Sequence, residues 1–132
     1  MEVLLVEPGK EARIAEIGND LKSLQAAVGG YIEAIYPFDD PIALVCNDEG
    51  KIMQMPLNRA LRGEDGRIYD AIAGSFFICG LGEDNFCSLP KDLQAKYLEK
   101  FRWPEKFLTV GGNLVAVQDR PSEAAHKPAP ER

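Results

Sequence analysis

The chain has 132 residues, of which 45% are hydrophobic and 27% are charged. This length is typical of one domain, and the composition favours a folded protein with its own hydrophobic core over a disordered chain. Acidic residues outnumber basic residues by 21 to 15, so the formal net charge is −6. That charge argues against direct nucleic-acid binding and against docking on an anionic membrane, because both require a basic surface.

The cysteines point to a reducing compartment. Cys46, Cys79 and Cys87 form no close pair, and their odd number favours free thiols. The first apolar run, Val3–Val6, is too short for a signal peptide or a membrane span. We therefore expect a cytoplasmic protein in which Cys46 and Cys79, each within an apolar segment, are buried as small hydrophobic side chains.

The first third of the chain predicts two strands followed by one helix. The apolar run Val3–Val6 suits the centre of a sheet, and the alternating segment Arg13–Ile17 would pair with it as a hairpin. Asn19 is a favourable cap for a short helix. The apolar side of that helix consists of Leu21, Leu24 and Val28.

The next segment predicts strands separated by a constrained corner. Tyr31–Tyr36 is rich in aromatic and β-branched residues, which is typical of a strand. Two prolines restrict the backbone of the corner Pro37–Pro41. A second strand follows at Ile42–Val45, and a tight turn leads to a further strand at Lys51–Met55. The segment Pro56–Leu61 is expected to form a helical turn, because proline is favoured at the first helical position.

The last third predicts a buried strand, a second helix and a closing hairpin. Phe76–Cys79 lies in the most hydrophobic run and is expected to be a central strand. Ser88 is a favourable cap for the amphipathic helix Lys91–Phe101. Two short strands would flank the turn Gly111-Gly112-Asn113 as a hairpin: Phe107–Val110 and Leu114–Val117.

These elements predict an α+β fold, with a mainly antiparallel β-sheet and two helices packed on one face. One domain is expected over residues 1–118. Residues 119–132 contain several prolines and no core-forming pattern, so we expect a disordered C-terminal tail. The single histidine, His126, falls in this tail, which argues against a histidine-based catalytic site in the folded body.

Paired carboxylates are the most prominent candidates for chemistry. Asp39-Asp40, Asp48-Glu49 and Glu64-Asp65 each fall at a predicted turn, where aspartate accepts hydrogen bonds from the nearby backbone. A metal-dependent hydrolase would need two such carboxylates in one cleft. With one histidine and no Cys-x-x-Cys motif, we expect neither a zinc site nor a cofactor. Turn chemistry is therefore the simpler interpretation of the three pairs.

Five residues form the candidate interaction surface. Phe38, Asp39 and Asp40 lie in the corner between two prolines, and a constrained loop of this kind is a suitable contact surface. Asn58 and Arg59 are added because the Arg59 guanidinium could bind an anion or pair with the turn carboxylates. An ion pair is the simpler interpretation of Arg59.

Several motifs of the chain resemble a known family. They are VLLVEPGK at the N-terminus, then LQAAVGGYIEAIYPFDDPIALVCNDEGK, MPLNRAL and IYDAIAGSFFICGLGEDNFCSL. Together these motifs are similar to a family known only as domain of unknown function number 3846, over roughly residues 1–118. Similar sequences occur in gut-associated Gram-positive bacteria and in their phages and conjugative elements. The resemblance implies a small accessory protein of a mobile element, and it carries over no catalytic residue.

We therefore expect a non-enzymatic protein-interaction module of a phage or mobile element, acting on host defence or on element maintenance. Its partner would be a protein that the sequence does not identify. The alternative is a small-ligand or nucleotide-binding regulator that uses Asn58, Arg59 and nearby carboxylates. A metal-dependent hydrolase that uses the paired acids is the third and least favoured hypothesis.

Overall fold

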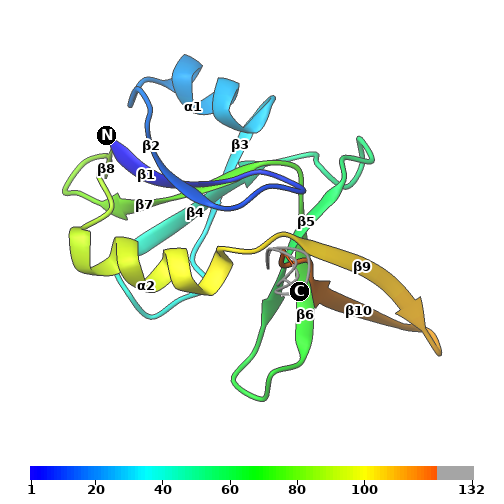
Figure 1. Ribbon diagram of the computed structural model, residues 1–132. Coiled ribbons are helices and arrows are strands. Elements are labelled where there is room, and N and C mark those ends of the chain that lie inside the picture. Colours follow the sequence, from blue (N-terminus) through cyan, green and yellow to red (C-terminus); the bar gives the residue numbers. More distant parts are fainter. Residues whose placement is uncertain (122–132) are drawn as a thin grey trace, which may run out of the picture.

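A computed structural model describes residues 1–121 of the chain, and these residues form two helices and ten strands (Figure 1). In chain order the elements are β1 (Glu2–Val6), β2 (Arg13–Glu16), α1 (Leu21–Val28), β3 (Ile32–Ile35), β4 (Ile42–Asn47), β5 (Leu57–Arg62), β6 (Ile68–Ala73), β7 (Phe76–Leu81), β8 (Phe86–Cys87), α2 (Lys91–Phe101), β9 (Glu105–Val110) and β10 (Asn113–Gln118).

The main sheet contains six strands. Five of them follow the order β2-β1-β7-β4-β3, and every neighbouring pair is antiparallel. The short strand β8 pairs with β7 outside this path. Strands β1, β4 and β7 lie inside the sheet, and nearly all of their residues are buried. The α+β class is thereby confirmed, and so are the central positions predicted for Val3–Val6 and Phe76–Cys79.

The two helices cover opposite faces of the main sheet (Figure 1). On one face, Leu24 and Val28 of α1 pack on alternate residues of the three inner strands: Val3, Leu5, Ala43, Val45, Phe77 and Cys79. On the other face, Tyr97 and Phe101 of α2 pack on the intervening residues: Leu4, Val6, Ile42, Leu44, Phe76 and Ile78. The prediction that both helices pack on one face is therefore wrong. Successive side chains of a strand point to opposite faces, so continuously apolar inner strands need cover on both sides.

Two hairpins, β5–β6 and β9–β10, form separate two-stranded ladders beside the main sheet. The first hairpin contributes Leu61 and Ile72 to the core on the α2 side. The helical turn predicted for Pro56–Leu61 is wrong, because Leu57–Arg62 pairs with β6 along its length. Burial and strand pairing outweigh the weak local preference that proline gives for a helix start.

The strand predicted for Lys51–Met55 is also wrong. Local hydrogen bonds close this segment into turns, with the N–H of Met53 donating to Glu49 and the N–H of Met55 donating to Gly50. Gly50 packs so closely on β6 that an added Cβ would lie 2.6 Å from the carbonyl oxygen of Ala73. The apolar side chain of Ile52 is 81% exposed, so it contributes nothing to a core.

Helix capping differs from the prediction at both helices. Asp20, rather than Asn19, caps α1, because its side chain accepts a hydrogen bond from the N–H of Ser23. Ser88 does not cap α2. Its hydroxyl accepts a hydrogen bond from the N–H of Glu2 at 2.8 Å, and it thereby ties β1 to the segment before α2.

The C-terminal hairpin lies at the predicted place, and each of its strands is two residues longer than predicted. Asp119 closes its base, because its N–H donates to the carbonyl oxygen of Pro104 at 2.7 Å. The expected disordered tail lies mostly outside the described residues, and so does His126. Among residues 1–121, no helix is long and apolar enough to cross a membrane.

Candidate functional site

The corner Pro37–Pro41 connects β3 to β4 and is anchored on helix α2 through an aromatic contact. The Phe38 ring lies 5.0 Å from the ring of Tyr97 and 5.9 Å from the ring of Phe101, measured between centroids. The ammonium of Lys100 lies 5.5 Å from the centre of the Phe38 ring, within the range of a cation–π interaction. Phe38 therefore anchors the corner on helix α2 through apolar contacts, and its side chain is only partly buried.

Asp40 supplies a second anchor on the same helix. One of its carboxylate oxygens accepts hydrogen bonds from the ammonium of Lys96 and from the hydroxyl of Tyr97, each at 2.7 Å. These two donors, Lys96 first, lower the pKa of Asp40 below its ordinary value. Burial, followed by the hydrogen bond to Asp40, raises the pKa of Tyr97. Asp40 is thus a charged group held in place by helix α2.

Asp39 is exposed and lies at the edge of a groove of about 370 Å³. Three separate segments line this groove: the corner, helix α2 and the β5–β6 hairpin. The lining residues are Pro37, Phe38, Asp39, Arg62, Gly63, Glu64, Tyr69, Lys96, Tyr97 and Lys100. We call it the corner groove. Two of the predicted surface residues, Phe38 and Asp39, line it directly.

The charges in the corner groove are mixed. Lys96 is paired with Asp40, and Arg62 is paired with Glu105 at 3.2 Å. Lys100 forms no ion pair with any other side chain of residues 1–121, so its positive charge faces the groove beside the Phe38 ring. The Lys100 side chain is exposed, and its place next to Phe38 depends on how the corner folds back onto α2.

Asn58 and Arg59 are not part of this surface. Their side chains are 0% and 1% exposed, so their assignment to an interaction surface is wrong. The side-chain amide of Asn58 donates to the carbonyl oxygens of Val6 and Gly74, both at 2.9 Å, and thereby joins β5 to β1 and to the β6–β7 turn. The proposed ligand-binding role of these two residues loses its basis, because a ligand cannot reach them.

The Arg59 guanidinium binds oxygen atoms of the polypeptide rather than a carboxylate. It donates to the carbonyl of Phe101 at 3.0 Å, to the carbonyl of Lys10 at 2.7 Å and to the side-chain oxygen of Asn58 at 2.8 Å. Burial lowers the pKa of Arg59 to about 10, and the nearby Glu105 opposes this change. The group stays charged at neutral pH, and the negative end of helix α2 offsets its charge. The predicted ion pair is absent from the described residues.

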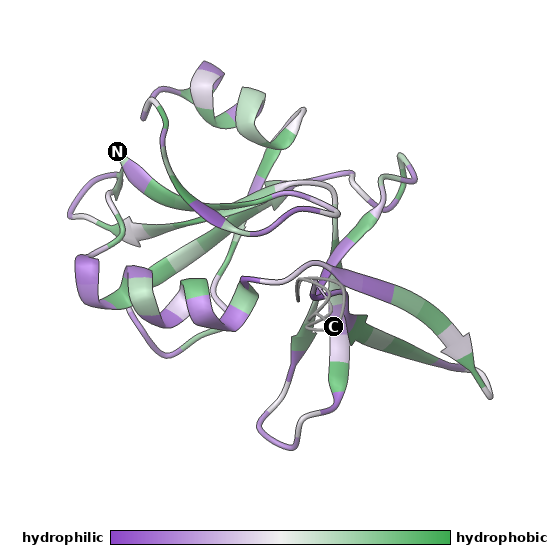
Figure 2. Ribbon diagram, in the orientation of Figure 1, coloured by the Kyte–Doolittle hydropathy of each residue, from purple (hydrophilic) through white to green (hydrophobic). Residues whose placement is uncertain are grey.

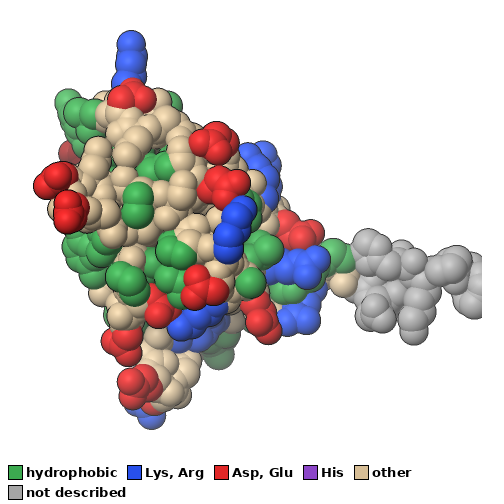
Figure 3. All heavy atoms as spheres, turned by 90° about the vertical axis from the view of Figure 1, so that its left-hand side faces the viewer, with side chains coloured by type: hydrophobic (Ala, Val, Ile, Leu, Met, Phe, Trp, Pro, Cys, Tyr) green, Lys and Arg blue, Asp and Glu red, His purple; other side chains and the backbone are tan. Residues whose placement is uncertain are grey.

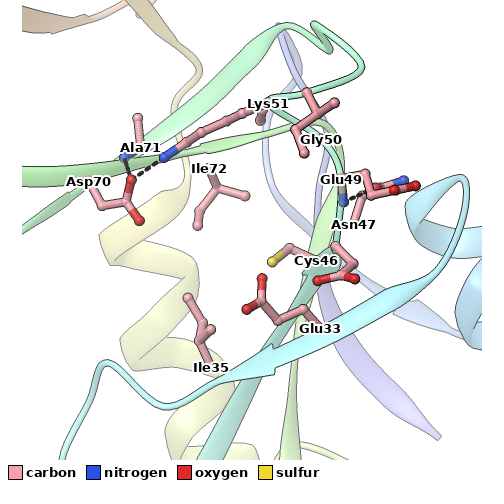
Figure 4. Close-up of a pocket in the computed structure, with 13 residues that line it drawn as sticks. Glu33, Ile35, Cys46, Asn47, Glu49, Gly50, Lys51, Asp70, Ala71 and Ile72 are labelled. Atoms are coloured by element: carbon pink, nitrogen blue, oxygen red, sulfur yellow. Dashed lines mark hydrogen bonds and ion pairs between the residues drawn. The ribbon is translucent and has the colours of Figure 1, made fainter.

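A second pocket, of about 210 Å³, brings several carboxylates together. Its acidic lining residues are Glu33, Asp48, Glu49 and Asp70. Figure 4 shows Asp70 at one end, bound to Lys51 and to the N–H of Ala71, and Glu49 at the other end. Within residues 1–121, no group of three side chains is placed to hold a metal ion. The acidic pairs at this pocket therefore give no support to a metal-dependent hydrolase.

Cys46 also lines the acidic pocket, but its thiol is not activated. Burial, followed by the nearby Glu33 carboxylate, raises the pKa of Cys46 to about 11, so the thiol is protonated at neutral pH. Cys46 and Cys79 are buried and all three cysteines are free, as the sequence predicted, and Cys87 is exposed.

Acidic and basic side chains are interspersed on the face of the molecule that Figure 3 displays. No extended basic patch is present on that face, which agrees with the net charge of −6. The corner groove is distinguished by a cation beside an aromatic ring rather than by a large field of one sign.

Comparison with known proteins identifies the family but no activity. No curated protein matches the chain, and no solved structure matches it. The family model described as a domain of unknown function, DUF3846, matches residues 1–102. The family match therefore ends just after helix α2. The resemblance noted in the sequence covers roughly residues 1–118, so it extends further and includes the β9–β10 hairpin. Because the match covers most of the chain, the protein belongs to the DUF3846 family.

Proposed function

We propose that this protein is a non-enzymatic interaction module that binds a partner protein through the corner groove. The observation that carries the proposal is that both chain neighbours of the exposed Asp39 contact helix α2. Phe38 and Asp40, its two neighbours, are both anchored on helix α2, whereas Asp39 itself is exposed at the groove edge. A contact residue held in this way loses little conformational entropy on binding, which favours recognition.

The charges of the groove define the kind of partner that fits. Asp39 and Glu64 offer carboxylates to a basic side chain, and Lys100 offers an ammonium to an acidic side chain. The half-buried Phe38 ring supplies apolar area between them. A partner segment that carries both a basic and an acidic residue, with an apolar side chain between them, would complement all three features.

The cellular setting of this function rests on the family. The resemblance to sequences of bacteria, phages and conjugative elements supports the proposal of a cytoplasmic accessory protein of a mobile element. Its partner would belong to host defence or to the machinery that maintains the element. A contact function of this kind needs no catalytic group and no cofactor.

The proposal is tested by comparing what two matched variants capture in cells that carry the element. Asp39→Lys reverses the charge at the groove, and Asp84→Lys makes the same change in the exposed β7–β8 loop outside it. We expect at least one protein to be captured equally by the wild type and by Asp84→Lys, and about tenfold less by Asp39→Lys. Equal recovery of every protein by the two variants would contradict the proposal.

A further inference from the structure

The β9 strand carries an open hydrogen-bonding edge. Gly111 and Gly112 form the two-residue turn of this hairpin, with φ angles of 58° and 83°, so Val110 and Asn113 form the first hydrogen-bonded pair. Hydrogen-bonded and non-hydrogen-bonded pairs then alternate along the ladder. The N–H and C=O groups of Phe107 and Thr109 accordingly point away from β10.

Two contacts agree with this alternation. Continuing the alternation by one pair beyond Glu105 and Gln118 makes Pro104 and Asp119 a hydrogen-bonded pair. In agreement, the carbonyl of Pro104 accepts a hydrogen bond from the N–H of Asp119. The same alternation predicts that the carbonyl of Ala116 points away from β9. In agreement, the guanidinium of Arg62 in the β5–β6 hairpin donates to this oxygen at 3.5 Å. Arg62 therefore lies against the β10 edge. The base of β9 also contacts β5, because the Glu105 carboxylate accepts hydrogen bonds from the N–H of Ala60 and from Arg62. On the β9 edge, the outward groups of Phe107 and Thr109 have no partner within residues 1–121.

The hairpin also exposes apolar side chains. Leu108, Val110 and Val117 are 46%, 55% and 52% exposed and lie on one face together with Val115. The hairpin projects from the body in Figure 1, and its strands are largely hydrophobic in Figure 2. A two-stranded ribbon is marginal in water, and an apolar edge strand without proline or bulge favours the addition of another strand.

We propose that β9 pairs antiparallel with β9 of a second copy of this chain, with the two-fold axis at Phe107. In this register the outward N–H of each Phe107 donates to the C=O of Phe107 in the other copy, and Glu105 faces Thr109 of the second copy. Lys106 faces Leu108 of the second copy, so no two like charges lie opposite each other. The product is a continuous four-stranded sheet. One of its faces carries Leu108, Val110, Val115 and Val117 of both copies, together with Lys106 of each copy.

A second copy fits this edge better than the remainder of the chain does. Residues 122–132 hold no large apolar side chain, and Pro128 and Pro130 among them could not donate to the ladder. The register itself is self-complementary, as a two-fold contact between identical surfaces requires. Because one strand and one hairpin face make a small interface, we expect a weak dimer whose population rises with protein concentration.

Sedimentation equilibrium over a wide concentration range tests the proposal. Leu108→Lys places a lysine opposite Lys106 of the second copy, at both symmetry-related positions. Val110→Lys is the matched control, since it adds the same charge to the same strand and face but lies opposite Pro104 of the second copy. Leu108→Glu offers Lys106 of the second copy an opposite charge. Thermal unfolding of each variant verifies that it is folded.

We expect the wild type to dimerise and Leu108→Lys to weaken the dimer about tenfold. The dissociation constant of the Val110→Lys dimer should equal that of the wild type. The Leu108→Glu dimer should be at least as tight as the wild-type dimer. A wild type that stays monomeric up to millimolar concentration would overturn the proposal. So would equal weakening by Leu108→Lys and Leu108→Glu, because the proposed register assigns them opposite effects. The capture experiment on Asp39 is independent of this result, since the corner groove and the β9 edge share no residue.

Discussion

Arg59 illustrates how a charged side chain becomes part of a core. Its guanidinium is surrounded by carbonyl oxygens from the β1–β2 loop and from the end of α2, and it joins both to β5. Residue type and local sequence predicted an ion pair or an anion site instead. Carbonyl groups of distant segments leave no signature in the sequence, so this arrangement could not be foreseen from the chain alone.

We predict that Arg59→Met will lower the free energy of unfolding by about 3–5 kcal/mol, because several buried carbonyl oxygens lose their donor. Urea denaturation of both proteins measures the difference. Arg67→Met is the control, because the Arg67 side chain is 88% exposed and its loss should change stability by less than about 0.5 kcal/mol. Equal stability of the two variants would show that the Arg59 contacts contribute little.

Asp40 should make stability depend on pH in the acid range. Hydrogen bonds from Lys96 and Tyr97 lower its pKa in the folded protein below the ordinary value of 3.8. The stabilisation by ionised Asp40 is therefore complete above that value, and it is lost as the pH falls through the lower pKa of the folded state. Asp40→Asn removes this contribution at every pH.

The stability difference between the wild type and Asp40→Asn should accordingly be largest near neutral pH and shrink as the pH drops below 3.8. Urea denaturation at a series of pH values measures it. Asp39→Asn serves as the matched control, since its exposed carboxylate accepts neither hydrogen bond. A difference that stays constant throughout the acid range would mean that the charge of Asp40 does not anchor the corner.

Among the elements, hydrophobic periodicity predicted those with a strong local pattern. The helix Lys91–Phe101 and the inner strands have such a pattern, and the structure confirms them. Leu57–Arg62 was missed because Pro56 favours a helix start, whereas pairing with β6 forms only once the chain is folded. Leu21 was placed in the apolar side of α1, yet it is 59% exposed, because the helix contacts the sheet mainly through its later turns.

The opposite placement of the two helices predicts independent effects on stability. Leu24 lies in the core on the α1 side and Ile78 in the core on the α2 side. Leu24→Ala should cost about 2–5 kcal/mol and Ile78→Val about 0.5–1.5 kcal/mol. In the double variant the two costs should add to within about 0.5 kcal/mol, since the two side chains share no packing partner. Urea denaturation of the single and double variants measures the departure from additivity. A departure well above that value would mean that Leu24 and Ile78 belong to one core.

At the scale of the whole molecule, the sheet carries the corner and α2 on the same side as the β5–β6 hairpin, and the corner groove forms where the three meet. The sequence identified Phe38 and Asp39 because two prolines enclose them. It could not identify Arg62, Tyr69 and Lys100 as their neighbours, since these residues come from segments that meet only in the folded chain. Composition could suggest an acidic contact protein. The mixed charges of the groove could not be predicted in this way, because they come from three segments that lie together only in the folded protein.

The most direct test of the contact function is the affinity of a captured partner for a variant in which the groove charges are exchanged. Asp39→Lys combined with Lys100→Asp keeps the net charge but reverses both groove charges. Isothermal titration calorimetry should show a dissociation constant at least about tenfold weaker than that of the wild type. An unchanged dissociation constant would contradict the claim that this protein acts through the corner groove.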